Sequence, residues 1–188
     1  IEFESGNERV GVQTAQEALE LAQKIQQQPF INFEGIMPYP CDKQVEPFVT
    51  QAKHVFAKSG ITINTVSAGG TPGMWDVHEV QGITELRAGT YIYNDRHIVG
   101  SGTAILDECA THVHATVTSR PTENRAVIDA GSKTLSSDLM RPEYGQGYGL
   151  ILEYPKAIIK KLNEEHGIID LCACTTKPKI GEVVRIVP

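Results

Sequence analysis

Residues 65–76 read TVSAGGTPGMWD, and they continue the apolar, β-branched run Ile61–Val66. Such a run is typical of a buried strand, because β-branched side chains pack well on a pleated surface. The glycines and the proline that follow favour a bend that exposes several backbone N–H groups on one side. The stretch therefore predicts a strand that ends in an anion-binding turn. A flexible loop with a tight turn at Pro72-Gly73 is the alternative interpretation.

The first half of the chain alternates between strand patterns and helix patterns. A capping box formed by Thr14 and Glu17 precedes an apolar stripe at helical spacing. We expect a second helix over residues 45–56, stopped by Gly60, and a short third helix over residues 74–81. The expected strands are residues 1–4, 32–37, 61–67 and 83–86. This succession predicts a parallel sheet, in which ligands bind at the carboxyl ends of the strands.

The texture of the sequence changes beyond Asp95. Apolar and polar residues alternate over residues 111–118, which is typical of a half-buried strand. The single helix expected in this half covers residues 155–165 and ends at His166. The further expected strands are residues 125–128, 147–153, 168–174 and 182–187. We therefore expect two domains, residues 1–95 and residues 96–188, of which the second is a mainly antiparallel β domain.

Composition narrows the partners of this chain. Its 188 residues carry 17 Lys and Arg against 23 Asp and Glu, a net charge of -6 at pH 7 without a basic run. This balance argues against nucleic acid or an anionic membrane surface as a partner. No window resembles a membrane span, and the first residues do not resemble a signal peptide. The four cysteines do not form a dense disulfide framework, so a cytoplasmic location is expected.

Two pairs of side chains of the metal-binding type lie close in sequence. Cys172 and Cys174 form one pair, and His112 and His114 form the other. In a strand, either spacing places both side chains on one face. A structural zinc site needs about four ligands, and neither pair has further candidates beside it. Small buried residues and a solvated strand face are the preferred interpretations, so no metal ligand is assigned in this chain.

Other side chains are expected at the same end of the sheet as the glycine turn. Arg9 follows the first expected strand and Tyr39 follows the second, while Ser67 and Thr71 add hydroxyl donors to the turn. A guanidinium at this level can bind an oxygen of a ligand, although a solvated loop arginine and a packing aromatic are the plainer interpretations. A P-loop is excluded and a dinucleotide-binding motif is unsupported, since neither glycine pattern occurs.

Six short motifs taken together resemble one group of enzymes. The motifs are GNERVGV (6–12), SAGGTP (67–72), ELRAGTY (85–91), VIDAGSK (127–133), EEHG (164–167) and GEVVRIVP (181–188). In this order they resemble the D-threonine aldolase and D-serine dehydratase group of pyridoxal phosphate enzymes, whose barrel is related to that of alanine racemase. The resemblance covers nearly the whole chain.

The resemblance implies an α/β fold with two parts. Residues 1–95 would form the C-terminal half of a TIM (β/α)8 barrel of the alanine racemase type. Residues 96–188 would form a mainly antiparallel β domain of the D-serine dehydratase type, incomplete at its C-terminus. Pyridoxal phosphate would lie at the mouth of the barrel, and relatives of this kind form homodimers.

The resemblance also implies roles for individual residues. Arg9 would hydrogen-bond the phenolic oxygen of the cofactor, and Tyr39 would lie at its pyridine nitrogen. Tyr91 and Asp129 would lie near the site without an assigned role. The residues that would hold the phosphate are Ser67, Gly69, Gly70 and Thr71.

The implied activity is that of a pyridoxal phosphate-dependent lyase that acts on D-amino acids with the help of a divalent metal, zinc or manganese. The cofactor would stabilise the carbanionic species left by Cα–Cβ or Cα–H cleavage. An amino-acid racemase and a non-catalytic pyridoxal phosphate-binding protein are the alternatives, and the β domain argues against the second because single-barrel carriers lack one.

Several parts of the family pattern fall outside this sequence or depart from it. The Schiff-base lysine of the family lies upstream of Ile1, and its metal ligands follow the Val-Pro at which the sequence stops, so a longer chain is expected. Lys133 is not a substitute for that lysine, because its motif belongs to the β domain. Relatives often have Tyr-x-Gly-His where this chain has Tyr39-Pro40-Cys41-Asp42, so no base is assigned to that loop.

Overall fold

The computed structural model describes residues 1–6 and 8–188, so Asn7 of the first family-like motif lies outside the described residues. This part of the chain divides into two compact units, Ile1–Gly89 and Thr90–Pro188. Each unit has its own cluster of buried apolar side chains. Among the described residues, no helix combines the length and the apolar character that crossing a membrane requires.

Two α-helices of the first unit confirm the helix patterns of the sequence. In α1, Ala15–Gln26, Thr14 Oγ1 accepts a hydrogen bond from Glu17 N at 3.1 Å, and a Glu17 carboxylate oxygen accepts one from Thr14 N at 3.2 Å. These bonds complete the expected capping box. The second helix, α2, spans Glu46–Lys58 and is followed by Gly60, whose φ of 70° suits the end of a helix.

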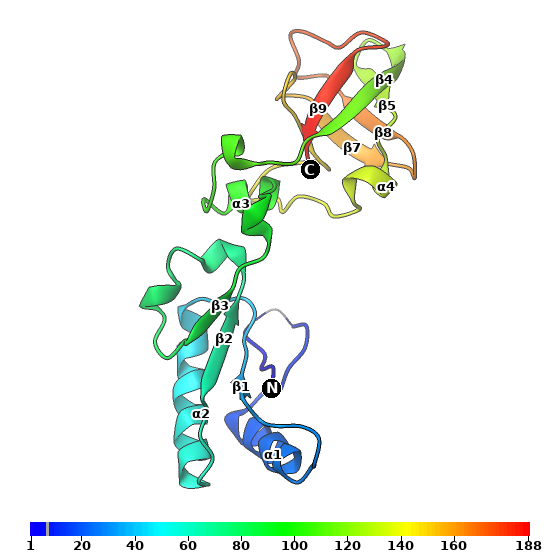
Figure 1. Ribbon diagram of the computed structural model, residues 1–188. Coiled ribbons are helices and arrows are strands. Elements are labelled where there is room, and N and C mark those ends of the chain that lie inside the picture. The colour runs from blue at the N-terminus through cyan, green and yellow to red at the C-terminus, as the bar shows by residue number, and fades with distance from the viewer. Residues whose placement is uncertain (7) are drawn as a thin grey trace. The chain divides into compact units, whose positions relative to one another are not determined.

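The sheet of the first unit is parallel, as expected. Its strands β1 (Gly35–Ile36), β2 (Thr65–Gly69) and β3 (Glu85–Arg87) lie in the order β1-β2-β3. The N-terminal segment pairs alongside the strand β1 region through a parallel bridge between Glu2 and Met37. Four parallel segments therefore follow one another in sequence order, as in a βα barrel, with their carboxyl ends at one edge (Figure 1).

The prediction of a third helix over residues 74–81 is wrong, because no α-helix forms there. Residues 74–81 contain only a short 3₁₀ turn, Val77–Glu79, preceded by another at Thr71–Gly73. The segment lies between Gly73 and Gly82, the latter with φ of 88°. It is too short to repay the cost of helix nucleation, so isolated turns form instead.

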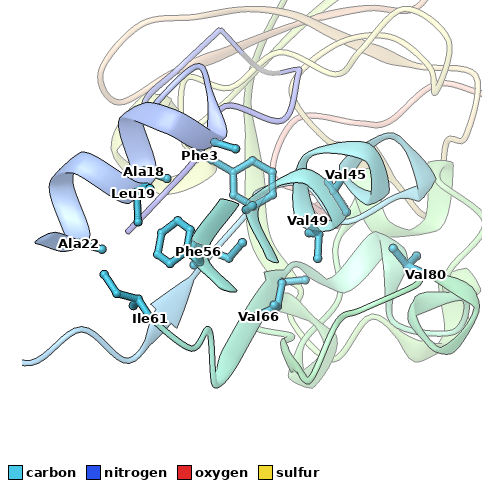
Figure 2. Close-up of a cluster of buried hydrophobic side chains, with 14 of the residues drawn as sticks. Phe3, Ala18, Leu19, Ala22, Val45, Val49, Phe56, Ile61, Val66 and Val80 are labelled. Atoms are coloured by element: carbon cyan, nitrogen blue, oxygen red, sulfur yellow. The ribbon is translucent and has the colours of Figure 1, made fainter. Parts of the chain in front are cut away.

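The core of the first unit lies between the two helices and the sheet (Figure 2). Leu19 from α1 and Phe56 from α2 are buried in the same cluster as Val66 of β2. Each such side chain stabilises the fold by about 1.5–3 kcal/mol through loss of apolar surface from water. The Phe3 ring also stacks on Phe48, with ring centroids 3.9 Å apart.

The second unit is built on an antiparallel sheet, as expected. Its strands are β4 (Val113–Thr122), β5 (Arg125–Ile128), β6 (Leu150–Ile151), β7 (Ile158–Leu162), β8 (Gly167–Asp170) and β9 (Val183–Val187), in the order β6-β9-β4-β5-β8-β7. Tyr148 N donates to Ile159 O at 3.0 Å, which brings the two edges of the sheet together. The sheet therefore curls into a barrel-like form around its own core. Two short helices, α3 (Arg96–Gly100) and α4 (Ser132–Leu135), complete the unit.

The helix expected over residues 155–165 is wrong, because this segment contains β7. A hairpin turn joins β7 to β8, where Asn163 N donates to His166 O at 2.8 Å, so His166 lies in a turn and not at a helix end. The pairing of β7 shifts register between Ile159 and Lys161, which marks a bulge. The bulge interrupts the alternation of buried and exposed residues, and the remaining apolar spacing imitates that of a helix.

Candidate functional site

The glycine turn begins where β2 ends, at Gly69. Ser67 and Thr71 bring their side chains to this point, and they are only 8% and 2% exposed. Thr71 Oγ1 accepts a hydrogen bond from Gly89 N at 3.2 Å, which ties the turn to the end of β3. Within residues 1–6 and 8–188, the Gly70 N–H has no hydrogen-bond acceptor. Hydroxyl groups and a backbone donor thus gather at one strand end.

Tyr39 lies directly against the glycines of this turn. A Cβ added at Gly69 would lie 3.1 Å from Tyr39 Cδ2, and one added at Gly70 would lie 3.0 Å from Tyr39 Cε2. Both separations are shorter than ordinary carbon contacts, so larger residues would push the ring away. The Tyr39 backbone is held in turn by the Ser5 hydroxyl, which donates to Tyr39 O at 2.6 Å. The glycines here allow a close approach between two strand ends.

Arg9 also contacts the Tyr39 ring. Its guanidinium carbon is 4.9 Å from the ring centroid, a cation–π contact, and its Nη2 donates to Glu2 Oε1 at 2.8 Å. The Glu4 carboxylate orders the same loop by accepting from Gly6 N at 2.6 Å and from Arg9 N at 3.1 Å. The structure therefore brings together Arg9, Tyr39 and the glycine turn, which the sequence places far apart.

Arg87 is a site residue to which the sequence analysis gave no role. Its Nη2 donates to Pro38 O at 3.1 Å, and its Nη1 donates to Ser67 Oγ at 2.8 Å and also to Ser67 O. The signal that could have found it is an arginine at the carboxyl end of an expected strand of the parallel sheet, where a partly buried charged side chain needs partners. Arg87 thus lies beneath the glycine turn and joins the ends of three strands.

Three other residues discussed above lie in the second unit. Tyr91 belongs to the turn Thr90–Ile92 of that unit, so its expected place beside a cofactor stays a prediction. Asp129 accepts a hydrogen bond from Thr116 N at 2.7 Å, which is a contact within the β domain. Lys133 pairs with Glu164 and Glu165 at 3.1 Å and 2.8 Å. Nothing in these contacts distinguishes Asp129 or Lys133 from structural residues of the β domain.

Cys41 is buried beside Gly73 of the glycine turn. Burial raises the pKa of its thiol, Asp42 raises it further, and Arg87 opposes the change. The thiol is therefore neutral near pH 7. Among the described residues, no group of three or more His, Cys, Asp or Glu side chains is placed to hold a metal ion.

The donors at the carboxyl ends of the strands suit a phosphate monoester. Ser67 and Thr71 supply hydroxyls, Gly70 supplies a backbone N–H, and Arg87 supplies positive charge. Phosphate oxygens accept several charge-assisted hydrogen bonds, and glycines let the backbone approach them closely. Arg9 adds a second cation, which contacts the ring of Tyr39, the residue that packs on the turn. The site can therefore hold a flat ligand that carries a phosphate at one end and an anionic oxygen at the other.

Two family models match the chain. Residues 1–97 match "Alanine racemase, N-terminal domain", and residues 110–188 match "Putative serine dehydratase domain". Over its whole length the chain is 27% identical to a D-threonine aldolase from Arthrobacter sp, of which it covers 52%. Over 73% of its length it is 30% identical to a D-threo-3-hydroxyaspartate dehydratase from Delftia sp. (strain HT23), of which it covers 40%. The chain thus spans about half the length of these relatives.

Solved structures show the same fold. The Delftia dehydratase superposes on the whole chain with a TM-score of 0.78 at 23% sequence identity, and the match covers 57% of that protein. A variant of a D-threo-3-hydroxyaspartate dehydratase, solved in its metal-free form, matches with a TM-score of 0.77. These likenesses confirm the expected fold, in which part of an alanine racemase-like α/β barrel is followed by an antiparallel β structure.

Proposed function

Because the chain belongs to the alanine racemase N-terminal domain family through residues 1–97, we propose that this protein is a pyridoxal phosphate-dependent lyase acting on D-amino acids. The choice of a lyase of the aldolase or dehydratase type rests on the match of residues 110–188 to a dehydratase domain and on the names of the relatives. The observation that carries the proposal is the glycine turn packed against Tyr39, whose ring also contacts the Arg9 guanidinium.

The proposed seat of the cofactor uses the donors described above. The phosphate binds to Ser67, Gly69, Gly70 and Thr71. Arg9 binds the phenolic oxygen, because a guanidinium is always charged and favours the unprotonated form of that oxygen. Tyr39 would lie at the pyridine nitrogen, and its close packing on Gly70 holds it beside the turn that would bind the phosphate. Tyr91 is proposed as a residue of the same site.

Bound pyridoxal phosphate supplies an electron sink that stabilises carbanionic charge at the substrate Cα. The residues of this chain orient that group. The turn fixes the phosphate, and Arg9 withholds a proton from the phenolic oxygen. Tyr39, which is 39% exposed and contacts Arg9 through its ring, would confine the cofactor ring from one side. Placement of this kind makes a bond to the substrate Cα the one that breaks.

A divalent metal, zinc or manganese, extends the proposal because a dehydratase relative has a solved metal-free form. The described residues do not fit such a site, since no group of three or more potential ligands comes together in them.

The proposal includes the organisation of the protein. Residues 1–95 form the C-terminal half of the alanine racemase-like barrel, and residues 96–188 form the β domain. The substrate is a small D-amino acid, and the assembly is a homodimer. A cytoplasmic location agrees with the four cysteines, all among the described residues and all free thiols.

The experiment is an activity screen of the full-length protein with pyridoxal phosphate, in the presence and absence of zinc or manganese. The substrates are D-threonine, D-serine, D-threo-3-hydroxyaspartate and alanine. We expect glycine with acetaldehyde from D-threonine, or a keto acid with ammonia from the other two D-amino acids. Interconversion of alanine enantiomers alone would indicate a racemase. Cofactor binding without turnover would indicate a carrier and would contradict the enzyme proposal.

A further inference from the structure

Arg87 ends β3, and its guanidinium lies across the carboxyl-end regions of β2, its neighbour, and of β1, the strand beyond. Nη2 donates to Pro38 O, two residues past β1, at 3.1 Å. Nη1 donates to both oxygens of Ser67 in β2, the backbone O and, at 2.8 Å, the side-chain Oγ. One planar group therefore joins three strand ends. The fixed fork of a guanidinium suits this task better than the point charge of a lysine.

The hydrogen bond to Arg87 determines what the Ser67 hydroxyl can do. A guanidinium has only donors, so Ser67 Oγ is the acceptor and keeps its own hydrogen for another group. Within residues 1–6 and 8–188, the structure gives that hydrogen no acceptor, although Ser67 is buried. The cationic neighbour also polarises the hydroxyl and strengthens it as a donor. A ligand with an anionic oxygen would satisfy it.

The charge of Arg87 points to the same kind of ligand. In the described part of the chain, no carboxylate lies within ion-pair distance of Arg87, and its hydrogen bonds go to uncharged oxygens. A Cβ added at Gly69 would lie 3.1 Å from Arg87 Nη2, so the guanidinium packs against the glycine turn. Uncompensated positive charge thus lies beneath the turn, where a phosphate dianion would be stabilised.

We propose that Arg87 is a positioning residue for phosphate binding: it fixes the Ser67 hydroxyl as a donor to a phosphate monoester and holds the ends of β1 and β2 beneath the glycine turn. The inference rests on the proposed function in taking that phosphate to be the one of pyridoxal phosphate. The same hydroxyl would bind inorganic phosphate, which lets the two ideas be tested apart.

The test is a double-mutant cycle of Ser67→Ala and Arg87→Lys in the full-length protein, with folding checked by circular dichroism. Dissociation constants for inorganic phosphate and for pyridoxal phosphate are measured by calorimetry. We expect each single substitution to raise the dissociation constants of both ligands about tenfold, because one charge-assisted hydrogen bond is lost. The dissociation constants of the double variant should lie within about twofold of those of the single variant that binds more weakly, because both substitutions remove the same interaction.

Several outcomes would overturn the inference. Losses that multiply to about a hundredfold in the double variant would show that the two residues act independently. An Arg87→Lys variant with the phosphate affinity of the original protein would show that charge alone is enough. Pyridoxal, which lacks the phosphate, should keep its affinity within about twofold in Arg87→Lys; a loss as large as that of pyridoxal phosphate would indicate a merely structural role.

A second pair of variants keeps the test decisive if Arg87→Lys does not fold. Ser67→Thr retains a hydroxyl and should bind phosphate within about threefold of the original protein, whereas Ser67→Ala should not. Equal losses in both variants would contradict the inference. If the original protein binds inorganic phosphate through this pair but not pyridoxal phosphate, the proposed function fails and the role of Arg87 stands. If it binds neither, both fail.

Discussion

Gly70 lies directly against Tyr39 in the candidate site, and its lack of a side chain is a steric requirement. Its φ of -145° is open to any residue, so the backbone conformation alone does not demand glycine. The constraint is instead Tyr39, whose Cε2 would lie 3.0 Å from an added Cβ. The turn and the aromatic ring are therefore fitted to each other across two strands.

Replacing Gly70 with valine tests this fit. The branched side chain would displace the Tyr39 ring and occupy the space proposed for the phosphate. We expect the Gly70→Val variant to bind pyridoxal phosphate at least about tenfold more weakly in an equilibrium titration, since several hydrogen bonds would be misaligned. Thr62→Ala, exposed and ahead of β2, is the control and should bind as the original protein does. Unchanged affinity for pyridoxal phosphate in Gly70→Val would mean that the turn is an ordinary loop that does not bind the phosphate.

Sequence reasoning found part of this site and missed Arg87, for a physical reason. Ser67, Gly69, Gly70 and Thr71 form one local motif, and a strand end rich in glycine is recognisable without a structure. The partners of Arg87 are 20 and 49 residues away in sequence, so only the folded chain brings them to it. The contact between Arg9 and Tyr39 is likewise a product of the fold, although both residues could be assigned to the same edge of the sheet.

At the scale of elements, α1 shows how local signals decide a helix. Both hydrogen bonds of the capping box are present, between neighbours three residues apart. Thr14→Ala removes the side-chain acceptor for Glu17 N and should lower the free energy of unfolding by about 1 kcal/mol. Chemical denaturation would measure the change. Gln23→Ala, on the exposed side of the same helix, is the control and should not destabilise the protein; equal stability of Thr14→Ala would mean that the cap contributes nothing.

β7 shows the limit of local signals. The run Ala157–Leu162 satisfies a helical spacing as well as a strand, because the bulge between Ile159 and Lys161 disturbs the alternation. Its pairing with β8, and the closeness of Tyr148 to Ile159, decide in favour of the strand. Tertiary pairing of this kind overrides local propensity and cannot be read from one segment.

Tyr154 gives the β domain a dependence on pH. Its hydroxyl donates to Glu182 Oε1 at 2.5 Å, and this hydrogen bond, followed by burial, raises the pKa of Tyr154 from 10.0 to about 12. The folded state therefore keeps a proton that the unfolded state loses. The stabilisation is fully present below pH 10 and is lost as the pH rises through about 12.

Tyr154→Phe should accordingly lower the free energy of unfolding by about 1 kcal/mol at neutral pH. The difference from the original protein should shrink as the pH rises above 10.0 toward about 12, in denaturation curves recorded across that range. Tyr148→Phe is a matched control, because no hydrogen bond of the Tyr148 hydroxyl occurs within the described residues. A deficit in Tyr154→Phe that stays constant over the same range would contradict this account.

At the scale of the whole molecule, the order of the elements carries the family likeness. Parallel βα units in Ile1–Gly89 and an antiparallel sheet in Thr90–Pro188 follow one another, and the two family models match residues 1–97 and 110–188. The sequence indicated this change of texture, because helical spacing and strand alternation differ in period. The chain spans about half the length of its relatives, so the activity of the whole protein stays a proposal.

The central claim is that the turn after β2 binds the phosphate of pyridoxal phosphate. The most direct test compares the dissociation constants of pyridoxal phosphate and pyridoxal for the full-length protein under one set of conditions. Because Ser67, Gly70 and Thr71 are proposed to bind the phosphate, with Arg87 beneath them, we expect pyridoxal phosphate to bind at least about a hundredfold more tightly than pyridoxal. Equal affinities for the two compounds would show that the turn holds no phosphate and would contradict the account.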